Sequence, residues 1–238
     1  MNKILYVRHG ESEANKMLSE LKKSFDKNNK DELDFIKTMI NAKLTDLGEE
    51  QSIKTCIKLF DDMQYGQYKN YKNICILVSP YIRTQQTASK LLTLLDENNV
   101  SHNLMELVNI REYTGQHKII PQNMKDKGVT HDLDWKAFVN RVKNFNDQLK
   151  ELITSDGYDL VIVFSHGLFL SVLLGIQCVQ EAYIGEQPIS FELNNCSISE
   201  LVFLNTNNDD NNNESNENID KIEGKIWQIN KVGDISHI

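Results

Sequence analysis

Short apolar runs alternate with longer amphipathic stretches along this chain. Residues 3–7, 74–78, 104–110 and 160–164 consist mainly of apolar side chains, as buried strands do. In the stretches between them, hydrophobic residues recur at steps of three and four, which is typical of helices with one buried face. Strands that alternate with helices predict an α/β fold of three layers, α/β/α, with a mostly parallel central sheet flanked by helices on both faces.

Three helical stretches have the clearest pattern. Thr45 has the side chain of an N-cap, and apolar residues follow it from Ile53 to Phe60 at helical spacing. A second helix is predicted through Ala88–Leu95. A third carries a long apolar stripe over Trp135–Leu152, whose aromatic side chains we interpret as packing in the core.

Two segments depart from this alternation. Residues 16–43 are lysine-rich and amphipathic, and we expect a helical insertion that is either a solvated excursion or a lid. Residues 205–224, rich in Asn, Asp and Glu, predict a disordered acidic loop between closing strands at 198–204 and 225–229. Because no repeat or Pro/Gly-rich linker divides the chain, we expect residues 1–238 to form a single domain.

Composition and charge narrow the function by exclusion. The chain of 238 residues is 40% hydrophobic and 25% charged, which is typical of a globular protein. Its apolar runs are too short to cross a bilayer and its N-terminus lacks a signal-peptide core, so we expect a cytoplasmic protein with no membrane partner. Residues 205–224 hold six acids and one lysine, a net −5 of the formal charge of −8. No basic stripe with interleaved aromatics is present, so we expect no nucleic-acid partner.

The four cysteines are scattered through the sequence. Cys56, Cys75, Cys178 and Cys196 form no CxxC pair and have no histidine at zinc-ligand spacing. They therefore indicate neither a disulfide framework nor a metal site.

Polar residues follow each of the four predicted strands. Arg8 and His9 come after the first, Arg83 shortly after the second, Glu112 after the third and His166 after the fourth. Since the carboxyl ends of parallel strands lie at one edge of a sheet, we expect these side chains to converge on one pocket. Each alone has a simpler interpretation: a hydrogen-bonded structural histidine for His166, or a surface pair with its neighbouring arginine for Glu112. The combination at one sheet edge favours a functional site.

This set of side chains suits phosphoryl transfer without a metal. Arginine holds phosphoryl oxygens bidentately and stays charged, and the sequence places two of its four arginines in these motifs. A neutral imidazole can attack phosphorus, so His9 is the candidate nucleophile. Glu112 is the candidate acid that protonates the leaving oxygen, and His166 would bind the phosphoryl oxygens.

Four motifs carry a resemblance to a known family. They are Arg8-His9-Gly10 followed by Asn15, the Leu-Thr-x-x-Gly-x-x-Gln pattern over 44–51, the Ser-Pro-x-x-Arg pattern over 79–83, and Phe-Ser-His-Gly over 164–167. Together they resemble the histidine phosphatase superfamily, also called the phosphoglycerate mutase-like superfamily. Residues 224–227 and 236–238 also resemble that family's closing strand and tail.

The resemblance implies a role for each matching residue. His9 would be the phosphorylated nucleophile, Arg8, Arg83 and His166 would form the phosphate pocket, and Asn15 would contact the substrate. It also implies that neither a metal nor another cofactor is required.

Two departures from the family pattern bear on the reaction. Gly115 follows Glu112 by three positions where many members have four, which leaves Glu106 as the alternative acid. Ala14 stands where glycolytic mutases commonly carry Trp, and their Glu-Arg-His-Tyr-Gly stretch is absent. We therefore expect a metal-independent phosphatase of a small phosphorylated metabolite that works through a phosphohistidine. The alternatives are cofactor-dependent phosphoglycerate mutase-type transfer and a catalytically idle module that binds phosphoproteins. No oligomeric state is predicted.

Overall fold

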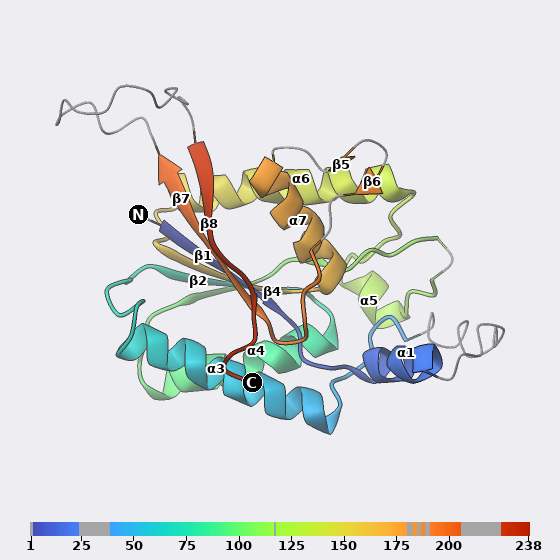
Figure 1. Cartoon of the computed structure of the whole chain (residues 1–238), viewed down its shortest axis with the longest axis horizontal. Coiled ribbons are helices and arrows are strands. Elements are labelled where there is room, and N and C mark those ends of the chain that lie inside the picture. The colour runs from blue at the N-terminus through green and yellow to red at the C-terminus, as the bar shows by residue number, and fades with distance from the viewer. Residues whose placement is uncertain are drawn as a thin grey trace.

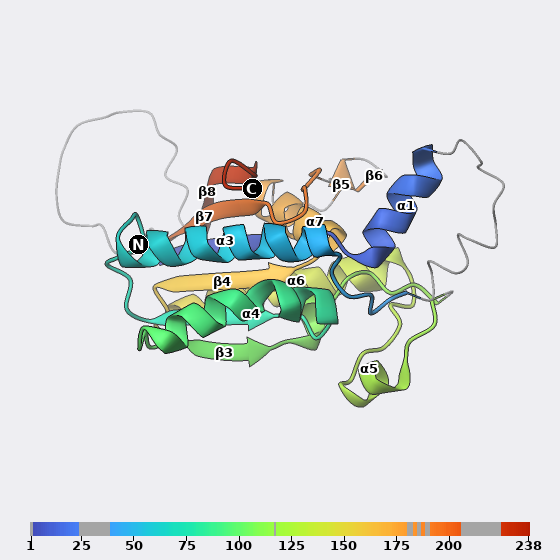
Figure 2. The same cartoon turned by 90° about the horizontal axis from the view of Figure 1, so that it is seen from below.

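A computed structural model describes most of the chain. The described residues are 2–23, 39–116, 118–179, 183–184, 187–188, 191–205 and 225–238. Figures 1 and 2 show their helices and strands from two directions.

Six strands form the central sheet, in the order β3-β2-β4-β1-β7-β8 (Figure 1). Their bounds are Asn2–Arg8 (β1), Ile74–Val78 (β2), Asn103–Glu106 (β3), Leu160–Ser165 (β4), Ile198–Asn205 (β7) and Lys225–Asp234 (β8). The pairs β1–β4, β4–β2 and β2–β3 are parallel. Strand β7 is antiparallel to β1, and β8 is antiparallel to β7. The predicted mostly parallel sheet is confirmed. Two short strands, β5 (Tyr183–Ile184) and β6 (Gln187–Pro188), pair separately.

Helices cover both faces of this sheet. Their bounds are Glu13–Lys23 (α1), Asp46–Gln64 (α3), Ile82–Glu97 (α4), Gln122–Asp126 (α5), Trp135–Thr154 (α6) and Gly167–Val179 (α7). Helices α3 and α4 lie on one face and α6 and α7 on the other, as Figures 1 and 2 show. The three-layer α/β/α architecture is therefore confirmed.

The strands are apolar along their whole length because both of their faces are buried. In β1, Ile4 and Tyr6 pack with the side chains of α6 and α7, whereas Leu5 and Val7 pack with those of α3 and α4. Such burial on two sides is typical of a parallel sheet between helical layers. The two cores hold the carboxyl ends of the strands at fixed positions, and the candidate site lies at those ends.

The third strand is shorter than predicted. The expected strand over 104–110 was too long, because β3 ends at Glu106 and residues Val108–Ile110 form a 3₁₀ helix. The partner strand β2 ends at Val78, opposite Glu106, and its last carbonyl accepts from Leu107 N at 2.9 Å. With no further ladder partner the chain turns, and Glu112 follows on a loop.

The predicted helical insertion and the predicted acidic loop lie largely outside the described residues. Helix α1 begins at Glu13, three residues before the predicted insertion, where Ser12 Oγ accepts from Asn15 N at 3.3 Å. The predicted insertion over 16–43 and the acidic loop over 205–224 fall mostly outside the described part of the chain, so both remain predictions. The closing strand pair is confirmed, with β8 running on to Asp234.

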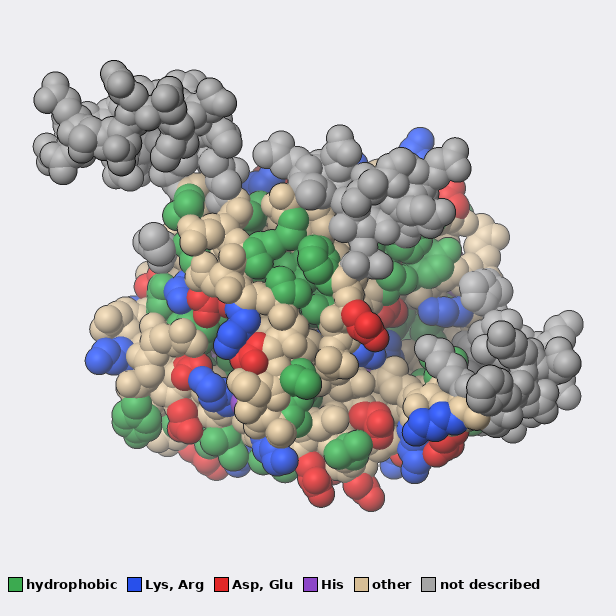
Figure 3. Space-filling model, in the orientation of Figure 1, with side chains coloured by type: hydrophobic (Ala, Val, Ile, Leu, Met, Phe, Trp, Pro, Cys, Tyr) green, Lys and Arg blue, Asp and Glu red, His purple; other side chains and the backbone are tan. Residues whose placement is uncertain are grey.

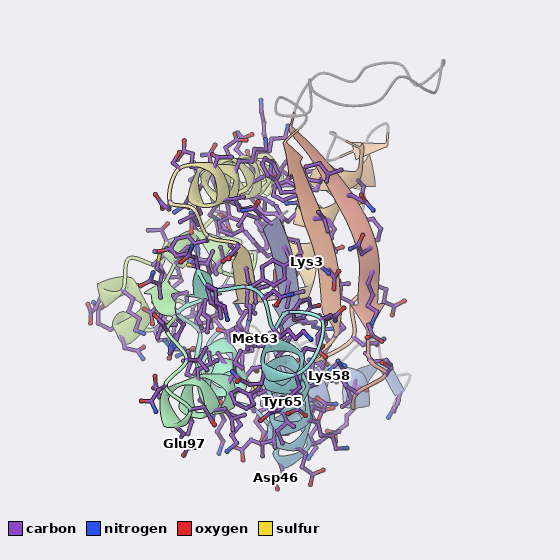
Figure 4. The ribbon with its side chains drawn as sticks, turned by 90° about the vertical axis from the view of Figure 1, so that its left-hand side faces the viewer. Lys3, Asp46, Lys58, Met63, Tyr65 and Glu97 are labelled. Atoms are coloured by element: carbon purple, nitrogen blue, oxygen red, sulfur yellow. The ribbon has the colours of Figure 1, made fainter. Side chains whose placement is uncertain are left out.

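The amino-terminal end of β1 carries a separate polar cluster. Figure 4 labels Lys3, whose Nζ lies 2.6 Å from Glu200 Oε1 on β7. Tyr68 donates its hydroxyl to the other oxygen of this buried carboxylate at 2.5 Å. Since all three groups are paired with one another, we interpret this cluster as structural.

The surface is mixed in charge. Lysine and arginine side chains are interspersed with acidic ones over the described part of the face in Figure 3. No helix in the described portion of the chain is long and apolar enough to span a membrane.

Candidate active site

A cavity of about 340 Å³ lies at the carboxyl ends of the strands. Its described lining consists of Arg8, His9, Ser12, Ala14, Asn15, Leu18, Met39, Ile40, Tyr81, Arg83, Glu112 and Lys118. Five of the predicted site residues thus line one cavity although they are far apart in the sequence. The sixth, His166, is fully buried and lies next to it, with its ring centroid 5.3 Å from that of His9.

The orientation of the His9 ring is fixed by two hydrogen bonds. Nδ1 lies 2.7 Å from the carbonyl oxygen of Gly10, and Arg83 Nε donates to Nε2 at 3.0 Å. Because a carbonyl can only accept, Nδ1 carries the proton, and the donor at Nε2 requires a lone pair there. Burial, with the nearby Arg83 and Arg8 charges, holds the pKa of His9 well below its usual value. The ring is therefore neutral at pH 7, with the lone pair of Nε2 available to a ligand.

Two guanidinium groups flank this ring. Arg83, in the first turn of α4, is buried and also donates through Nη1 to the Ile40 carbonyl at 2.8 Å. Burial lowers its pKa to about 10, which leaves it charged at pH 7. Arg8, the last residue of β1, donates through Nη1 to the Leu193 carbonyl. Its Nε is buried and has no hydrogen-bond partner among the described residues.

His166 has a buried ring nitrogen without a partner. Its Nε2 lies 2.8 Å from Ser79 Oγ, whereas no described group satisfies Nδ1. Burial and the Arg83 charge keep the pKa of His166 well below its usual range, so the ring is neutral at pH 7. Unpaired buried polar atoms are rare in folded proteins. Arg8 Nε and His166 Nδ1 are two such atoms on predicted site residues, which leaves both free to bond to a ligand.

Glu112 is held at the cavity by backbone amides. Its two oxygens accept from Tyr113 N at 3.0 Å and from Leu168 N, in the first turn of α7, at 3.3 Å. The alternative acid Glu106 does not line the cavity. It is exposed and accepts from Lys127 Nζ at 2.8 Å and from Gln85 Nε2. The geometry therefore favours Glu112 over Glu106.

The loop that carries Glu112 is clamped by the two arginines outside the cavity. Asp132, almost fully buried, accepts from Arg111 Nη2 at 3.3 Å and from Arg141 Nη2 at 2.8 Å. Burial alone would raise the pKa of Asp132, but Arg141 and the Thr114 amide hold it below its usual value. Arg141 Nη1 also donates to the Arg111 carbonyl, next to Glu112, at 2.9 Å. The simpler interpretation of Glu112, a surface pair with Arg111, does not hold, because Arg111 is buried and belongs to an Arg111–Asp132–Arg141 clamp.

Asn15 lies at the cavity on α1. Its Oδ1 accepts from Ser12 Oγ at 3.0 Å and from Asn195 Nδ2 at 3.3 Å. Asn195 also donates to the backbone oxygen of His9 at 2.9 Å. The amide of Asn15 is thereby held in one orientation beside the nucleophile candidate.

The Leu-Thr-x-x-Gly-x-x-Gln motif builds the wall behind His9. Thr45 caps α3 by accepting from Gly48 N at 3.0 Å, and Gln51 Oε1 accepts from Glu11 N at 2.9 Å. A Cβ at Gly48 would lie 1.9 Å from the Glu11 carbonyl, and one at Gly10 would lie 2.4 Å from the Gly48 carbonyl. Only two glycines allow these backbones to approach so closely. The motif therefore positions the loop after β1, and Leu44 bridges to Ser12, but its own residues are not among those that line the cavity.

Sequence patterns did not identify several residues of the site. Tyr81 is fully buried and stacks edge-on to His166 at 5.1 Å. Lys118 donates to the Tyr113 carbonyl at 2.6 Å, and burial lowers its pKa. Tyr81 stands at a variable position of the Ser-Pro-x-x-Arg pattern, and Lys118 lies in a loop whose path hydrophobic periodicity does not predict. In the described residues, no three His, Cys, Asp or Glu side chains are grouped so as to hold a metal ion.

Comparison with known proteins agrees with this geometry. Similar solved structures include a phosphoglycerate mutase from Bacillus anthracis, 19% identical, with a TM-score of 0.58, covering 99% of this chain and 94% of that one. An alpha-ribazole phosphatase from Shigella flexneri is 20% identical, with a TM-score of 0.52, covering 84% and 90%. A mycobacterial glucosyl-3-phosphoglycerate phosphatase, solved with VO3, is 13% identical, with a TM-score of 0.53, covering 98% and 99%. The TM-scores and coverages show that these proteins share the fold of this chain.

No curated protein sequence matches the chain. The sequence model of the histidine phosphatase superfamily (branch 1) matches residues 4–209, which is most of the chain. The chain therefore belongs to the histidine phosphatase superfamily.

Proposed function

We propose that this protein is a metal-independent phosphomonoesterase that transfers the phosphoryl group of a small substrate to His9 and then to water. One observation carries the proposal: the neutral His9 ring presents Nε2 to a cavity between two guanidinium groups, with a carboxyl group in the same lining. Members of the superfamily among the similar structures are phosphatases and a mutase, which supports phosphoryl chemistry.

In the first step, His9 Nε2 attacks phosphorus and the bond from phosphorus to the leaving oxygen breaks. Glu112 gives its proton to that oxygen, so that a neutral alcohol departs. Arg8 and Arg83 stabilise the charge that develops on the other phosphoryl oxygens. The Arg83 donor that covers Nε2 in the free site turns to a phosphoryl oxygen when the substrate binds.

In the second step, a water molecule attacks phosphorus and gives a proton to Glu112. The bond between phosphorus and Nε2 breaks, and its electron pair returns to the ring. His166 Nδ1 and Arg8 Nε, both unpaired in the free site, are positioned to complete the hydrogen bonding of the transferred group. The sum is a phosphomonoester and water converted to an alcohol and phosphate, with enzyme protons restored.

The two alternatives differ in where the phosphoryl group goes. In a mutase it returns from His9 to a second position of the substrate, and in an idle binding module it never leaves the ligand. Hydrolysis of a phosphomonoester needs a nucleophile and an acid, and the cavity lining holds a residue of each type, His9 and Glu112. This favours hydrolysis over passive binding.

The proposal is tested by incubating the protein with p-nitrophenyl phosphate and measuring phosphate release. We expect multiple turnovers for the wild type and none above background for His9→Ala. The matched control is His102→Ala, which changes the residue directly before β3 and outside the cavity lining. This variant should release phosphate at the wild-type rate. A phosphoryl group that reaches water only slowly but is discharged by a phosphoglycerate would favour the mutase. Equal phosphate release by His9→Ala would contradict the proposal.

A further inference from the structure

The cavity has two chemically different halves. One half holds the groups that act on phosphorus: Arg8, His9, Arg83 and Glu112. The other half, on α1 and the segment that precedes α3, is lined by Ala14, Leu18, Met39 and Ile40, with Ser12 and Asn15 as its polar members. The first half takes the phosphoryl group under the proposed function, so the second half faces the leaving group.

The apolar side chains of this second half offer surface to a ligand. Ala14 and Leu18 are four residues apart on α1, which puts them on one face of that helix, and both are only half-buried. Met39 is half-buried as well, whereas Ile40 and Tyr81 are buried and close the wall behind it. A ligand that covers the exposed part of Leu18 and Met39 removes apolar surface from water, which stabilises the complex.

The polar side chains on this side are those of Ser12 and Asn15, and the oxygen of the Asn15 amide is already engaged. Ser12 Oγ donates to Asn15 Oδ1 at 3.0 Å, and Asn195 Nδ2 donates to the same oxygen at 3.3 Å. Hydroxyl groups on a leaving group would lose their hydrogen bonds to water and meet mainly hydrocarbon in exchange. An unpaired buried hydroxyl is costly, so this lining disfavours a polyhydroxylated alcohol.

The charges of the cavity lining are balanced by the phosphoryl group alone, without a second anionic group on the substrate. The described cations are Arg8, Arg83 and Lys118, and the described anion is Glu112. A phosphoryl dianion together with the Glu112 carboxylate balances the three cations. When Glu112 holds the proton for transfer, one positive charge is in excess, and Lys118 is the described cation that the phosphoryl chemistry does not use. Its Nζ already donates to the Tyr113 carbonyl at 2.6 Å, and burial lowers its pKa. A carboxylate or second phosphate on the leaving group would therefore meet only this one engaged cation.

We infer that the substrate is a phosphomonoester of an uncharged, mainly apolar alcohol, whose hydrocarbon body lies against Leu18 and Met39. This inference rests on the proposed function and adds the class of leaving group to it. It separates this site from one that acts on phosphoglycerates or on sugar phosphates.

The test compares esters whose alcohols differ in hydrocarbon and not in reactivity. Ethyl, butyl and propyl phosphate and glycerol 1-phosphate are supplied to the wild-type protein, and kcat/KM is obtained from phosphate release. A buried methylene is worth about a four-fold gain, so we expect kcat/KM to rise about ten-fold or more from ethyl to butyl phosphate. Propyl phosphate and glycerol 1-phosphate have the same carbon number, and we expect the propyl ester to be favoured about ten-fold.

A pair of matched variants assigns the preference to the wall. Leu18→Asn should reduce the propyl-to-glycerol ratio at least three-fold. Leu104→Asn makes the same change at a leucine on β3 that is 53% exposed and outside the cavity lining, and it should leave the ratio unchanged.

The outcomes separate the inference from the function on which it rests. A ratio that favours propyl phosphate and falls in Leu18→Asn supports the inference. Phosphate release with equal kcat/KM for the propyl and glycerol esters, or with a preference for the glycerol ester or for 3-phosphoglycerate, overturns the inference and leaves the proposed function standing. Phosphate release from none of these esters contradicts the proposed function and the inference with it.

Discussion

Arg83 donates its Nε–H to Nε2 of His9 across 3.0 Å, so in the free site a cation covers the lone pair that is proposed to attack phosphorus. The same guanidinium is held by the Ile40 carbonyl through Nη1. The contact orients the ring and also places a charge-assisted donor where the phosphoryl oxygens would bind. Under the proposed function, Arg83 orients the His9 ring through this contact and donates to the phosphoryl group once a substrate binds.

Replacing Arg83 tests this double role. Arg83→Met should lower kcat/KM for p-nitrophenyl phosphate by about 10²–10³-fold, because it removes a donor aimed at developing charge. Arg83→Lys should recover only part of this loss, since an ammonium lacks the planar fork. Thermal unfolding of both variants checks that the fold is intact. A methionine variant that is folded and as active as the wild type would rule out this role.

Glu112 is expected to act on the leaving oxygen. Glu112→Gln should lower kcat/KM for an alkyl phosphate about 10²–10⁴-fold and kcat/KM for p-nitrophenyl phosphate much less, because kcat/KM reports the transfer to His9 and nitrophenolate departs in that step without a proton. The matched control is Glu106→Gln, which changes an exposed carboxylate paired with Lys127 and should affect neither substrate. Equal slowing of both substrates by Glu112→Gln would assign the proton transfer to another group.

The Arg111–Asp132–Arg141 clamp should matter both for stability and for the position of Glu112. Asp132→Asn leaves the buried Arg111 and the largely buried Arg141 without a charged partner, and we expect the free energy of unfolding to fall by about 3–5 kcal/mol. In the folded fraction, kcat/KM for an alkyl phosphate should drop more than kcat/KM for p-nitrophenyl phosphate. A purely structural clamp would lower the stability and leave the ratio of the two substrates as in the wild type.

The close approach of two backbones at Gly48 makes that residue sensitive to a single methyl group. Gly48→Ala would bring a Cβ to 1.9 Å from the Glu11 carbonyl, and we expect a loss of about 2–3 kcal/mol in denaturant unfolding. Gly128→Ala is the control: its φ of +84° is strained for alanine, but nothing lies within 4 Å of the added carbon. We expect about 1 kcal/mol there. Similar losses at both positions would mean that the loop after β1 is not packed as described.

Stability should fall as the solution is acidified through the ordinary imidazole range. Burial and neighbouring arginines depress the pKa of His9 and of His166 in the folded state. Below about pH 6.5 these two rings bind protons in the unfolded chain but not in the folded one. Acidification therefore stabilises the unfolded state relative to the folded state. Each ring contributes at most about 1.4 kcal/mol per pH unit. Urea unfolding of the wild type and of His9→Asn between pH 7.5 and 5.5 should show a shallower slope for the variant, and identical slopes would contradict the assignment.

Much of the site could be predicted because the fold brings strand ends together. Arg8, His9 and His166 directly follow or end apolar strands, so their convergence follows from a parallel sheet. The position of Glu112 was harder to predict, because this residue lies six positions beyond the end of β3, on a loop whose path depends on Asp132 and Arg141. Hydrophobic periodicity contains no information about such a clamp.

The limits of prediction in the fold have a similar cause. The apolar run over 104–110 is strand-like by composition, yet only the part opposite β2 finds a ladder partner. Strand length is set by the neighbouring strand, and a local pattern does not contain it. Lys118 and Met39 enter the cavity from loops for the same reason: tertiary contacts place them, and their own neighbours in sequence do not.

The central claim is that Nε2 of His9 takes up the phosphoryl group. The most direct measurement mixes stoichiometric protein with p-nitrophenyl phosphate, quenches within milliseconds in alkali, where phosphohistidine survives, and maps the adduct by mass spectrometry and ³¹P NMR. The account predicts one phosphoryl group per chain, on His9 and bonded to Nε2, which appears before free phosphate and decays with turnover. Phosphate released with no adduct at any time, or an adduct on Nδ1 or on another residue, would contradict it.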